Sequence, residues 1–298
     1  MSITSQELEE FMIKAEKLDL VLYFMELNLL RKSFKCQECG IDCKFVKFKR
    51  SLEGYAWRCY EASCLKNRKY YSVRENSFFM GFNCSLKDIM LVIVRYSCFM
   101  QVYSIKAALN LSPRTIERIM KKLIQKIPET NFESSKLGGP KFVVEIDETM
   151  LNFKCKSHRG RSPSNKTDAL CIVEVGQKIT RAFAKIIPNK KIETILPIVI
   201  SQVMPGSVIW TDEHKSYQTL NKNGFLHQSV CHKYEFVNRT NGVNTQAVEA
   251  FHNELKLAIK KRKGVKTELR SDFLKEFCFY FNNKNNFLDA VLSLIKIN

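Results

Sequence analysis

The chain has 298 residues, 45% of them hydrophobic, with 21 Phe but only 7 Pro and 11 Gly. This length and composition support one large core plus an accessory module and argue against long disordered stretches. The 48 Lys and Arg against 30 Asp and Glu give a formal net charge of +18. Such an excess predicts a polyanionic partner, with nucleic acid as the expected one and a generally basic proteome or an anionic protein as the alternatives.

No membrane association is expected from this sequence. The longest apolar runs, such as residues 89–94, are too short for a transmembrane helix, and the acidic, amphipathic N-terminus does not fit a secretory signal. No basic amphipathic helix of the membrane-surface type is evident. In a chain without a secretion signal, eleven cysteines predict metal binding or buried thiols rather than disulfides.

The first segment predicts helices over residues 1–34. Thr4-x-x-Glu7 is a capping-box pattern, and apolar residues follow it at helical spacing, beginning with Leu8, Phe11 and Met12.

Residues 35–80 change in character and predict a zinc ribbon. Two cysteine pairs, separated by about twenty residues, have the spacing of a closed tetrahedral zinc site: Cys36, Cys39, Cys59 and Cys64. The second pair is looser than Cys-x2-Cys, so Cys43 remains a possible substitute ligand, and buried free cysteines are the alternative. One structural Zn²⁺ would stabilise a module too small to have its own core. The other cysteines lie in apolar contexts and are expected in the core: Cys84, Cys98, Cys155, Cys171, Cys231 and Cys278.

Residues 81–132 predict a helix-turn-helix-like module. A helix over 104–110 is followed by a short turn, then by Ser112 as the N-cap and Pro113 as the first residue of a helix that extends to about residue 127. DNA contacts are predicted on the second helix, from Arg114, Thr115, Arg118 and Lys121. The alternative is an amphipathic helix with a solvated basic face, and the net charge favours DNA.

After a polar linker at 133–141, the pattern becomes α/β and predicts a domain over residues 140–298. Three strands are expected at 141–147, 169–175 and 180–187, followed by a helix at 190–203. A strand beginning at Ser207 and ending at Asp212, a strand at 225–232 and a helix at 245–261 complete a mixed sheet with flanking helices.

Three carboxylates occupy positions that such a sheet would bring together. Asp147 lies in the first strand, Asp212 ends the fourth, and Glu249 lies on the closing helix beside its apolar face. Carboxylate oxygens suit Mg²⁺ or Mn²⁺, and two such ions about 4 Å apart promote phosphodiester cleavage. Because the chain offers 30 acidic residues, turn and cap roles remain the alternative on spacing alone.

Four segments, taken in order, resemble the conserved blocks of Merlin-type DDE transposases and their bacterial insertion-sequence relatives. They are VVEIDET (143–149), GSVIWTDEHKSYQTL (206–220), GFLHQSVCHKYEFVN (224–238) and GVNTQAVEAFHNELKLAIKKRKG (242–264). Thirty-six residues separate Asp212 from Glu249, as is typical of this family. The resemblance covers residues 141–265, and the modules in front of it also look like the family's N-terminal half.

The resemblance implies an RNase H-like fold in which Asp147, Asp212 and Glu249 hold two Mg²⁺ or Mn²⁺ ions. It implies a transposase that binds the terminal inverted repeats of double-stranded DNA, cleaves a phosphodiester with metal-activated water and joins the 3′-OH to target DNA. A homodimer or higher oligomer at the synapse is expected, because two DNA ends must be held. Two positions depart from the family pattern: Asn244 replaces a His, and His252 lies near the place of the usual Trp.

Further residues are expected to contact phosphate, although solvated polar roles are the alternative for each: Lys215, Tyr217, His232, Asn253, Lys256 and the basic segment 158–161. Residues 260–264 (KKRKG) fit either a nuclear-localisation patch or the basic end of a helix. The protein is expected in the nucleus of a eukaryotic host, and otherwise in the cytoplasm with the nucleoid. Two other functions remain open: a domesticated, non-catalytic DNA-binding or regulatory protein, and an RNase H-like nuclease with a cellular substrate.

Overall fold

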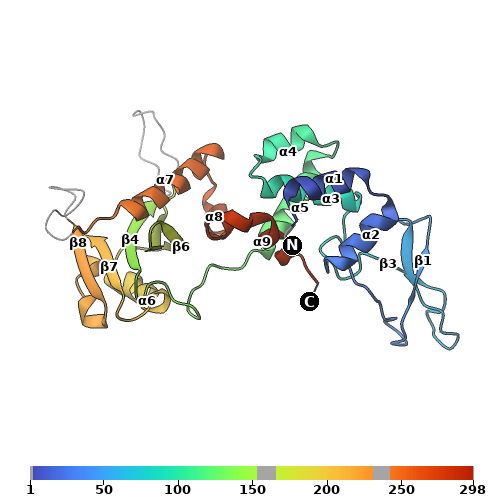
Figure 1. The fold of residues 1–298 in the computed structure, drawn as a ribbon, viewed down its shortest axis with the longest axis horizontal. Helices are drawn as coiled ribbons and strands as arrows, with labels where there is room; N and C mark the ends of the chain where they lie inside the picture. Colours follow the sequence, from blue (N-terminus) through green and yellow to red (C-terminus); the bar gives the residue numbers. More distant parts are fainter. Residues whose placement is uncertain (1–2, 153–165, 231–241, 298) are drawn as a thin grey trace. The chain divides into compact units, whose positions relative to one another are not determined.

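The computed structural model describes residues 3–152, 166–230 and 242–297 (Figure 1). The chain divides into two compact units: Met1–Lys126 with Asn285–Asn298, and Ile127–Lys284. The last residues therefore group with the N-terminal modules, whereas the sequence predicted a single domain over 140–298. The reason is aromatic packing within the first unit, where the Phe287 ring lies 5.7 Å from that of Tyr96 and 5.2 Å from that of Phe99.

The first unit begins with two short helices, α1 (Ser5–Lys14) and α2 (Lys17–Glu26). The predicted capping box is present: the Glu7 amide donates to Thr4 Oγ1 at 3.2 Å, and the Thr4 amide donates to Glu7 Oε2 at 2.9 Å. These bonds satisfy amide donors that a helix start would otherwise leave unpaired.

A small antiparallel sheet follows, formed by β1 (Lys44–Lys47), β2 (Tyr55–Arg58) and β3 (Tyr70–Ser72). A buried ion pair connects its β1–β2 turn to the chain beyond β3, because Arg74 Nε donates to Glu53 Oε1 at 3.0 Å. The same guanidinium donates to the carbonyls of Phe82 and Cys84, at 2.8 and 2.7 Å. Arg74 thus connects the β1–β2 turn with the backbone of residues 82–84.

The helical part of the first unit contains α3 (Leu86–Ser97), α4 (Val102–Ala108), α5 (Pro113–Lys126) and α9 (Phe287–Leu294). Four residues separate α4 from α5, and Ser112 caps α5 by accepting the Thr115 amide at 3.1 Å. The predicted short connection and cap are therefore present, whereas the helix-turn-helix assignment stays a prediction. Within the described residues, no helix is both long enough and apolar enough to cross a membrane.

The second unit contains a five-stranded mixed sheet in the order β6-β5-β4-β7-β8. The strands are β4 (Val143–Met150), β5 (Asp168–Val175), β6 (Ile179–Ile187), β7 (Val208–Asp212) and β8 (Leu226–Val230). The β4–β5 and β5–β6 pairs are antiparallel, whereas the β4–β7 and β7–β8 pairs are parallel. The predicted mixed α/β architecture is confirmed.

Helices cover both faces of this sheet. The helices are α6 (Ile192–Gln202), α7 (Gln246–Lys261) and α8 (Arg270–Asn283), with single 3₁₀ turns η1 (Lys215–Tyr217), η2 (Asn221–Asn223), η3 (Thr267–Leu269) and η4 (Lys284–Asn286). On one face, Val144 and Ile146 pack with Ile195 and Val199 of α6. On the other, residues of β5 pack with α7 and α8, including Cys171, Val248, Phe251 and Phe277. Because side chains alternate along a strand, successive residues of β4 face different helices.

Candidate functional site

Asp147, within β4, and Asp212, the last residue of β7, lie on two neighbouring parallel strands. The β4–β7 register pairs Val143 with Val208 and Glu145 with Trp210, and two residues further along each strand are the two aspartates. Asp147 is paired across β4–β5 with Cys171, whose side chain lies in the core under α7. Since paired residues share a face of a sheet, Asp147 faces α7, and Asp212 does the same by its spacing from Trp210.

The environment of Asp147 disfavours its negative charge. Burial raises the pKa of Asp147 to about 7, and the negative charges of Asp212 and Glu148 act in the same direction. The Glu148 amide donates to Asp147 Oδ1 at 2.7 Å, which lowers the pKa in part. Asp212 Oδ1 accepts the His214 amide at 3.1 Å. Two carboxylates that repel each other across adjacent strands form an arrangement that a divalent cation would stabilise.

Glu249 lies in the first turn of α7, and a second carboxylate positions that turn. Glu145, buried in β4, accepts the Val248 amide through Oε2 at 2.9 Å. Burial raises the pKa of Glu145 to about 7, although its backbone hydrogen bonds lower it. A carboxylate suits the amide-rich start of a helix. Glu145, which the sequence reasoning did not select, therefore holds the start of α7 on the face where Asp147 lies.

His252 lies three residues after Glu249 on α7 and is near Asp147. Its Nδ1 is 3.6 Å from Asp147 Oδ2, and its side chain is buried. Burial lowers the pKa of His252 to about 4, and the positive charges of Lys256 and Lys190 contribute. The imidazole is therefore neutral near pH 7. Lys190 also acts on Asp147 by lowering its pKa, which places two cations near the carboxylates.

The structure brings Asp147 close to Asp212 and to His252, but it does not gather all three predicted carboxylates tightly. Among the described residues, the four cysteines are the only group of three or more potential metal ligands whose ligand atoms all lie within 4.8 Å of one another. Asp147, Asp212 and Glu249 are thus more widely spaced than that limit. Their roles as metal ligands remain a prediction.

The opposite face of β4 contains a buried polar network that the sequence reasoning missed. Glu148 is paired with Leu170, on the α6 side of the sheet, and its carboxylate accepts the Tyr217 hydroxyl. Lys190 Nζ lies 3.4 Å from the other Glu148 oxygen. Tyr217 was predicted to contact DNA phosphate, and this prediction is wrong. Its side chain is fully buried, because η1 turns it into the core beside α6.

The other predicted DNA-contacting residues are mostly on the surface. On α5, Arg114, Arg118 and Lys121 are exposed, and Thr115 is half-buried. Arg118 donates to the Gly81 carbonyl at 3.1 Å and lies over the Phe82 ring. In the second unit, the exposed positions are Lys215, Asn253 and Lys256. His232 and residues 158–161 lie outside the described residues, so their contacts with phosphate stay predictions.

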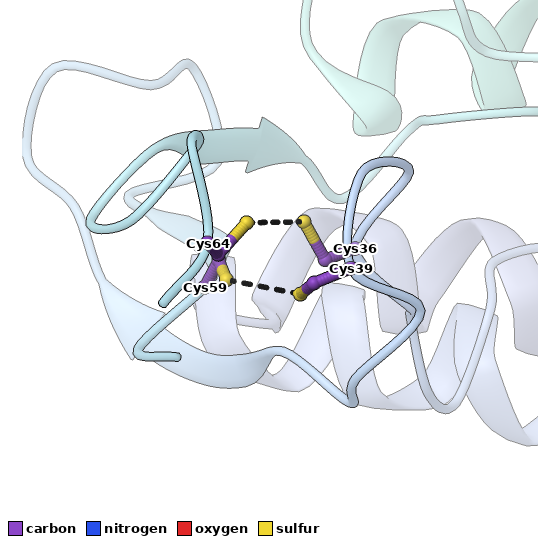
Figure 2. A group of neighbouring side chains, drawn as sticks. All are labelled: Cys36, Cys39, Cys59 and Cys64. Carbon is purple, nitrogen blue, oxygen red and sulfur yellow. Dashed lines mark hydrogen bonds between the residues drawn. The ribbon is translucent and has the colours of Figure 1, made fainter. Parts of the chain in front are cut away.

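The four predicted zinc ligands form one cluster, and Figure 2 shows their sulfur atoms facing one another. The Cys36 and Cys64 sulfurs are 3.7 Å apart, and those of Cys39 and Cys59 are 3.8 Å apart. A tetrahedral site with Zn–S bonds of about 2.3 Å places its sulfurs about 3.8 Å apart. These residues therefore fit Zn²⁺ in both number and spacing. Cys43 is buried outside this cluster.

The immediate surroundings of the cluster act on its thiols in opposite directions. The Tyr71 hydroxyl lies 3.3 Å from Cys36 Sγ and, with backbone hydrogen bonds, lowers the pKa of Cys36 to about 6. Burial raises the pKa of Cys64 to about 12, although the Lys66 amide donates to Cys64 Sγ at 3.3 Å. Of the cysteines expected in the core, Cys171 and Cys278 are buried and Cys84 is partly buried. Cys98 is exposed, contrary to expectation, because it is the C-terminal cap of α3. Cys155 and Cys231 lie outside the described residues.

A basic and aromatic surface on the small sheet also escaped the sequence reasoning. The guanidinium of Arg58 lies 4.9 Å from the Tyr60 ring centroid and 4.7 Å from that of Tyr70, and Lys44 Nζ lies 5.6 Å from Tyr60. The strand register places Lys44, Arg58 and Tyr70 in one row. The alternation of basic and apolar residues in KFVK and YAWR was the available sequence signal. It could not place Lys44 beside Arg58, because that requires the register between the two strands.

Comparisons with known proteins point to transposases. An uncharacterized transposase-like protein of Haemophilus influenzae is 29% identical over 116 residues, which are 39% of this chain and 91% of that protein. Two solved structures, a pre-cleavage Mos1 transpososome and a Mos1 strand transfer complex, show 9% identity and TM-scores of 0.22 and 0.21. The first covers 71% of this chain and 79% of that chain, and the second covers 70% and 78%. Scores this low establish no shared fold.

The family comparison is more informative than the structural one. Asp147, Asp212 and Glu249 all lie within residues 136–282, and this segment matches the model of the ISXO2-like transposase domain. The predicted resemblance to transposases is thus confirmed at the level of this domain, whereas the Merlin-type assignment stays a prediction. The second unit is, over most of its length, similar to a transposase domain.

Proposed function

We propose that this protein is a Merlin-type DDE transposase whose second unit is an RNase H-like catalytic domain with Asp147, Asp212 and Glu249 at its centre. The observation that carries the proposal is the placement of Asp147 and Asp212 on the neighbouring parallel strands β4 and β7, inside the segment that matches a transposase domain. The sheet order, with two antiparallel pairs followed by two parallel pairs, supports the RNase H-like assignment.

The residues at this site fit Mg²⁺ or Mn²⁺. Carboxylate oxygens are the donors these ions prefer, and Asp147 and Asp212 repel each other across adjacent strands. When bound, two such ions supply Lewis acidity to the attacking and leaving oxygens of a phosphodiester. Asp147, Asp212 and Glu249 would hold them.

The chain's own residues contribute positioning and charge. Glu145 fixes the start of α7, and with it Glu249, through the Val248 amide. Lys190, which is paired with Glu148, and Lys256 carry positive charge beside these carboxylates, and we assign them to the phosphate of bound DNA. Water or a 3′-OH would attack the phosphate in the same site, so hydrolysis and joining require no second centre.

DNA binding is assigned to both units. In the first, the exposed face of α5 would contact double-stranded DNA through Arg114, Arg118 and Lys121, with Thr115 beside its N-terminus. A structural Zn²⁺ at the cysteine cluster would keep the small sheet folded. In the second, Lys215 and Lys256 would contact the backbone of the terminal inverted repeats or the target. A homodimer or higher oligomer would hold two ends, in the nucleus if the host is eukaryotic.

Cleavage of labelled DNA tests this proposal. Purified full-length protein is incubated with Mn²⁺ and DNA ends carrying the terminal inverted repeats that flank its gene. Wild type should nick these ends and join them to a target duplex, whereas Asp147→Asn and Asp212→Asn should bind the same DNA without cutting it. Glu213→Gln, an exposed carboxylate variant beside Asp212, should cut normally. Cleavage that persists in Asp147→Asn would refute the catalytic assignment.

The same assay separates the alternatives. A domesticated regulatory protein would bind the repeats without cutting them, and a cellular nuclease would cut DNA whether or not the repeats are present. Two carboxylates on neighbouring strands and a third at the start of α7 favour catalysis, because a protein that only binds DNA gains nothing from negative charge at its binding surface.

A further inference from the structure

His252 and Glu249 share one side of α7. They are three residues apart, which is less than one turn, so both side chains project toward the same neighbour. That neighbour is β4, as the contact between His252 and Asp147 shows. A Glu-x-x-His pair on a helix is a spacing that can direct a carboxylate and an imidazole at one metal centre.

The imidazole is buried and only partly used. The side chain of His252 is 6% exposed, and its Nε2 has no hydrogen-bond partner among the described residues. Buried polar atoms are nearly always paired, so an unpaired one calls for an explanation. The other nitrogen, Nδ1, faces Asp147 at 3.6 Å, which is beyond a hydrogen bond of normal length. Neither nitrogen is therefore held in place by a strong partner of its own.

The spacing is close to that of two ligands of one ion. Adjacent ligands of an octahedral ion with bonds of about 2.1 Å lie about 3 Å apart. A closure of about half an ångström between His252 Nδ1 and Asp147 Oδ2 would reach that value.

We propose that His252 Nδ1 is a further ligand of the divalent ion held by Asp147, and that this imidazole makes the site favour Mn²⁺ over Mg²⁺. The inference rests on the proposed function, because it concerns the same metal site. Mg²⁺ prefers an all-oxygen shell, whereas imidazole nitrogen suits transition metals and the affinity order places Mn²⁺ among them. A Trp at this position could not donate a nitrogen lone pair, so the ligand would be specific to this chain's departure from the family pattern.

Pulsed electron paramagnetic resonance of bound Mn²⁺ tests the proposal on full-length, zinc-loaded, tag-free protein. Wild type should show ¹⁴N modulation from a directly bound imidazole. His252→Gln should lose the modulation and weaken Mn²⁺ binding by about tenfold or more, as loss of a supporting metal contact does, while Mg²⁺ binding changes much less. Glu254→Gln, an exposed carboxylate variant on the same helix, should match wild type.

Two further samples decide the origin of the signal. The chain has five histidines, and His214 lies near Asp212, so modulation that disappears in His214→Asn but persists in His252→Gln would overturn the proposal. Should His252→Gln fail to fold, wild type with ¹⁵N-labelled histidine still reports whether an imidazole is bound, and an absent nitrogen coupling overturns it. Mn²⁺ binding that needs Asp147 but shows no nitrogen coupling sinks this inference and leaves the proposed function intact. Mn²⁺ binding indifferent to Asp147 refutes the proposed function itself.

Discussion

Replacing Tyr217 by Phe should destabilise the second unit while leaving its packing unchanged. The ring is fully buried in the core beside α6, and the change removes only the hydroxyl that donates to Glu148. Burial, together with the Glu148 charge, raises the pKa of Tyr217 well above its ordinary value, so the hydroxyl stays protonated as a donor. Loss of a hydrogen bond to a buried charged group costs about 1.5–3 kcal/mol. Lys190, 3.4 Å from the other oxygen, remains as a partner, which places the expected cost near the lower end, about 2 kcal/mol.

The two tryptophans allow this cost to be measured in one unit at a time. Trp57 lies in the first unit and Trp210 in the second, so a Trp57→Phe background leaves Trp210 fluorescence as the reporter. Urea unfolding should give a lower midpoint for Tyr217→Phe with an unchanged slope. Tyr103→Phe, which removes an exposed hydroxyl, is the matched control. A Tyr217→Phe protein within about 0.5 kcal/mol of wild type would show that the hydroxyl is not paired with a buried carboxylate.

Three other predictions follow from individual contacts. Cys59→Ser should release the single equivalent of zinc measured by metal analysis, whereas Cys43→Ser should retain it, and retention by both variants would contradict the assigned ligand set. Ser112→Ala should lower the stability of the first unit by about 1 kcal/mol and Ser112→Gly by only a few tenths, as read from Trp57 in a Trp210→Phe background; equal losses would argue against an N-cap role. Burial raises the pKa of Glu174, but its bonds with Arg181, Thr180 and the Gly138 amide leave that pKa below 4.5. The contribution of the Glu174 carboxylate to stability is therefore complete above pH 4.5 and is lost as the pH falls through the lowered pKa. Glu174→Gln should be less stable than wild type by about 2 kcal/mol at pH 7, and this difference in unfolding free energy should become smaller in acid. A difference that does not depend on pH would contradict this account.

Local patterns were sufficient to predict most elements of the second unit. The apolar runs around Ile146, Ile172 and Ile209 have lengths and turn signals that only strands satisfy, and each became a strand. The cysteine spacing similarly predicted the cluster, because a knuckle brings Cys36 and Cys39 together without help from distant residues. Strand alternation also places Asp147 on the face opposite Glu148 once the direction of burial is known.

Such local patterns could not predict contacts between residues that are far apart in the sequence. Glu145 and Val248 are 103 residues apart, and Glu148 and Tyr217 are 69 apart. Neither pair has a local signal, since an acidic residue in a strand and a tyrosine within a polar segment both look like surface positions. Tyr217 was misplaced for this reason: its polar neighbours Lys215 and Gln218 are exposed, and only the 3₁₀ turn between them directs the ring inward. Tertiary geometry decided the role of each of these side chains.

The grouping of the C-terminal segment with the first unit has a topological consequence. The second unit is inserted into the first, so the chain crosses between them twice, near residues 126 and 284. A single protease nick at one crossing would leave the two units joined through the other. Packing of Phe287 against Tyr96 and Phe99, and the Ile297 amide bonded to the Asn28 carbonyl at 2.8 Å, would keep the returning segment in place. Separate expression of the second unit accordingly requires cuts at both crossings, and the first unit needs its final helix supplied by a fused or co-expressed peptide.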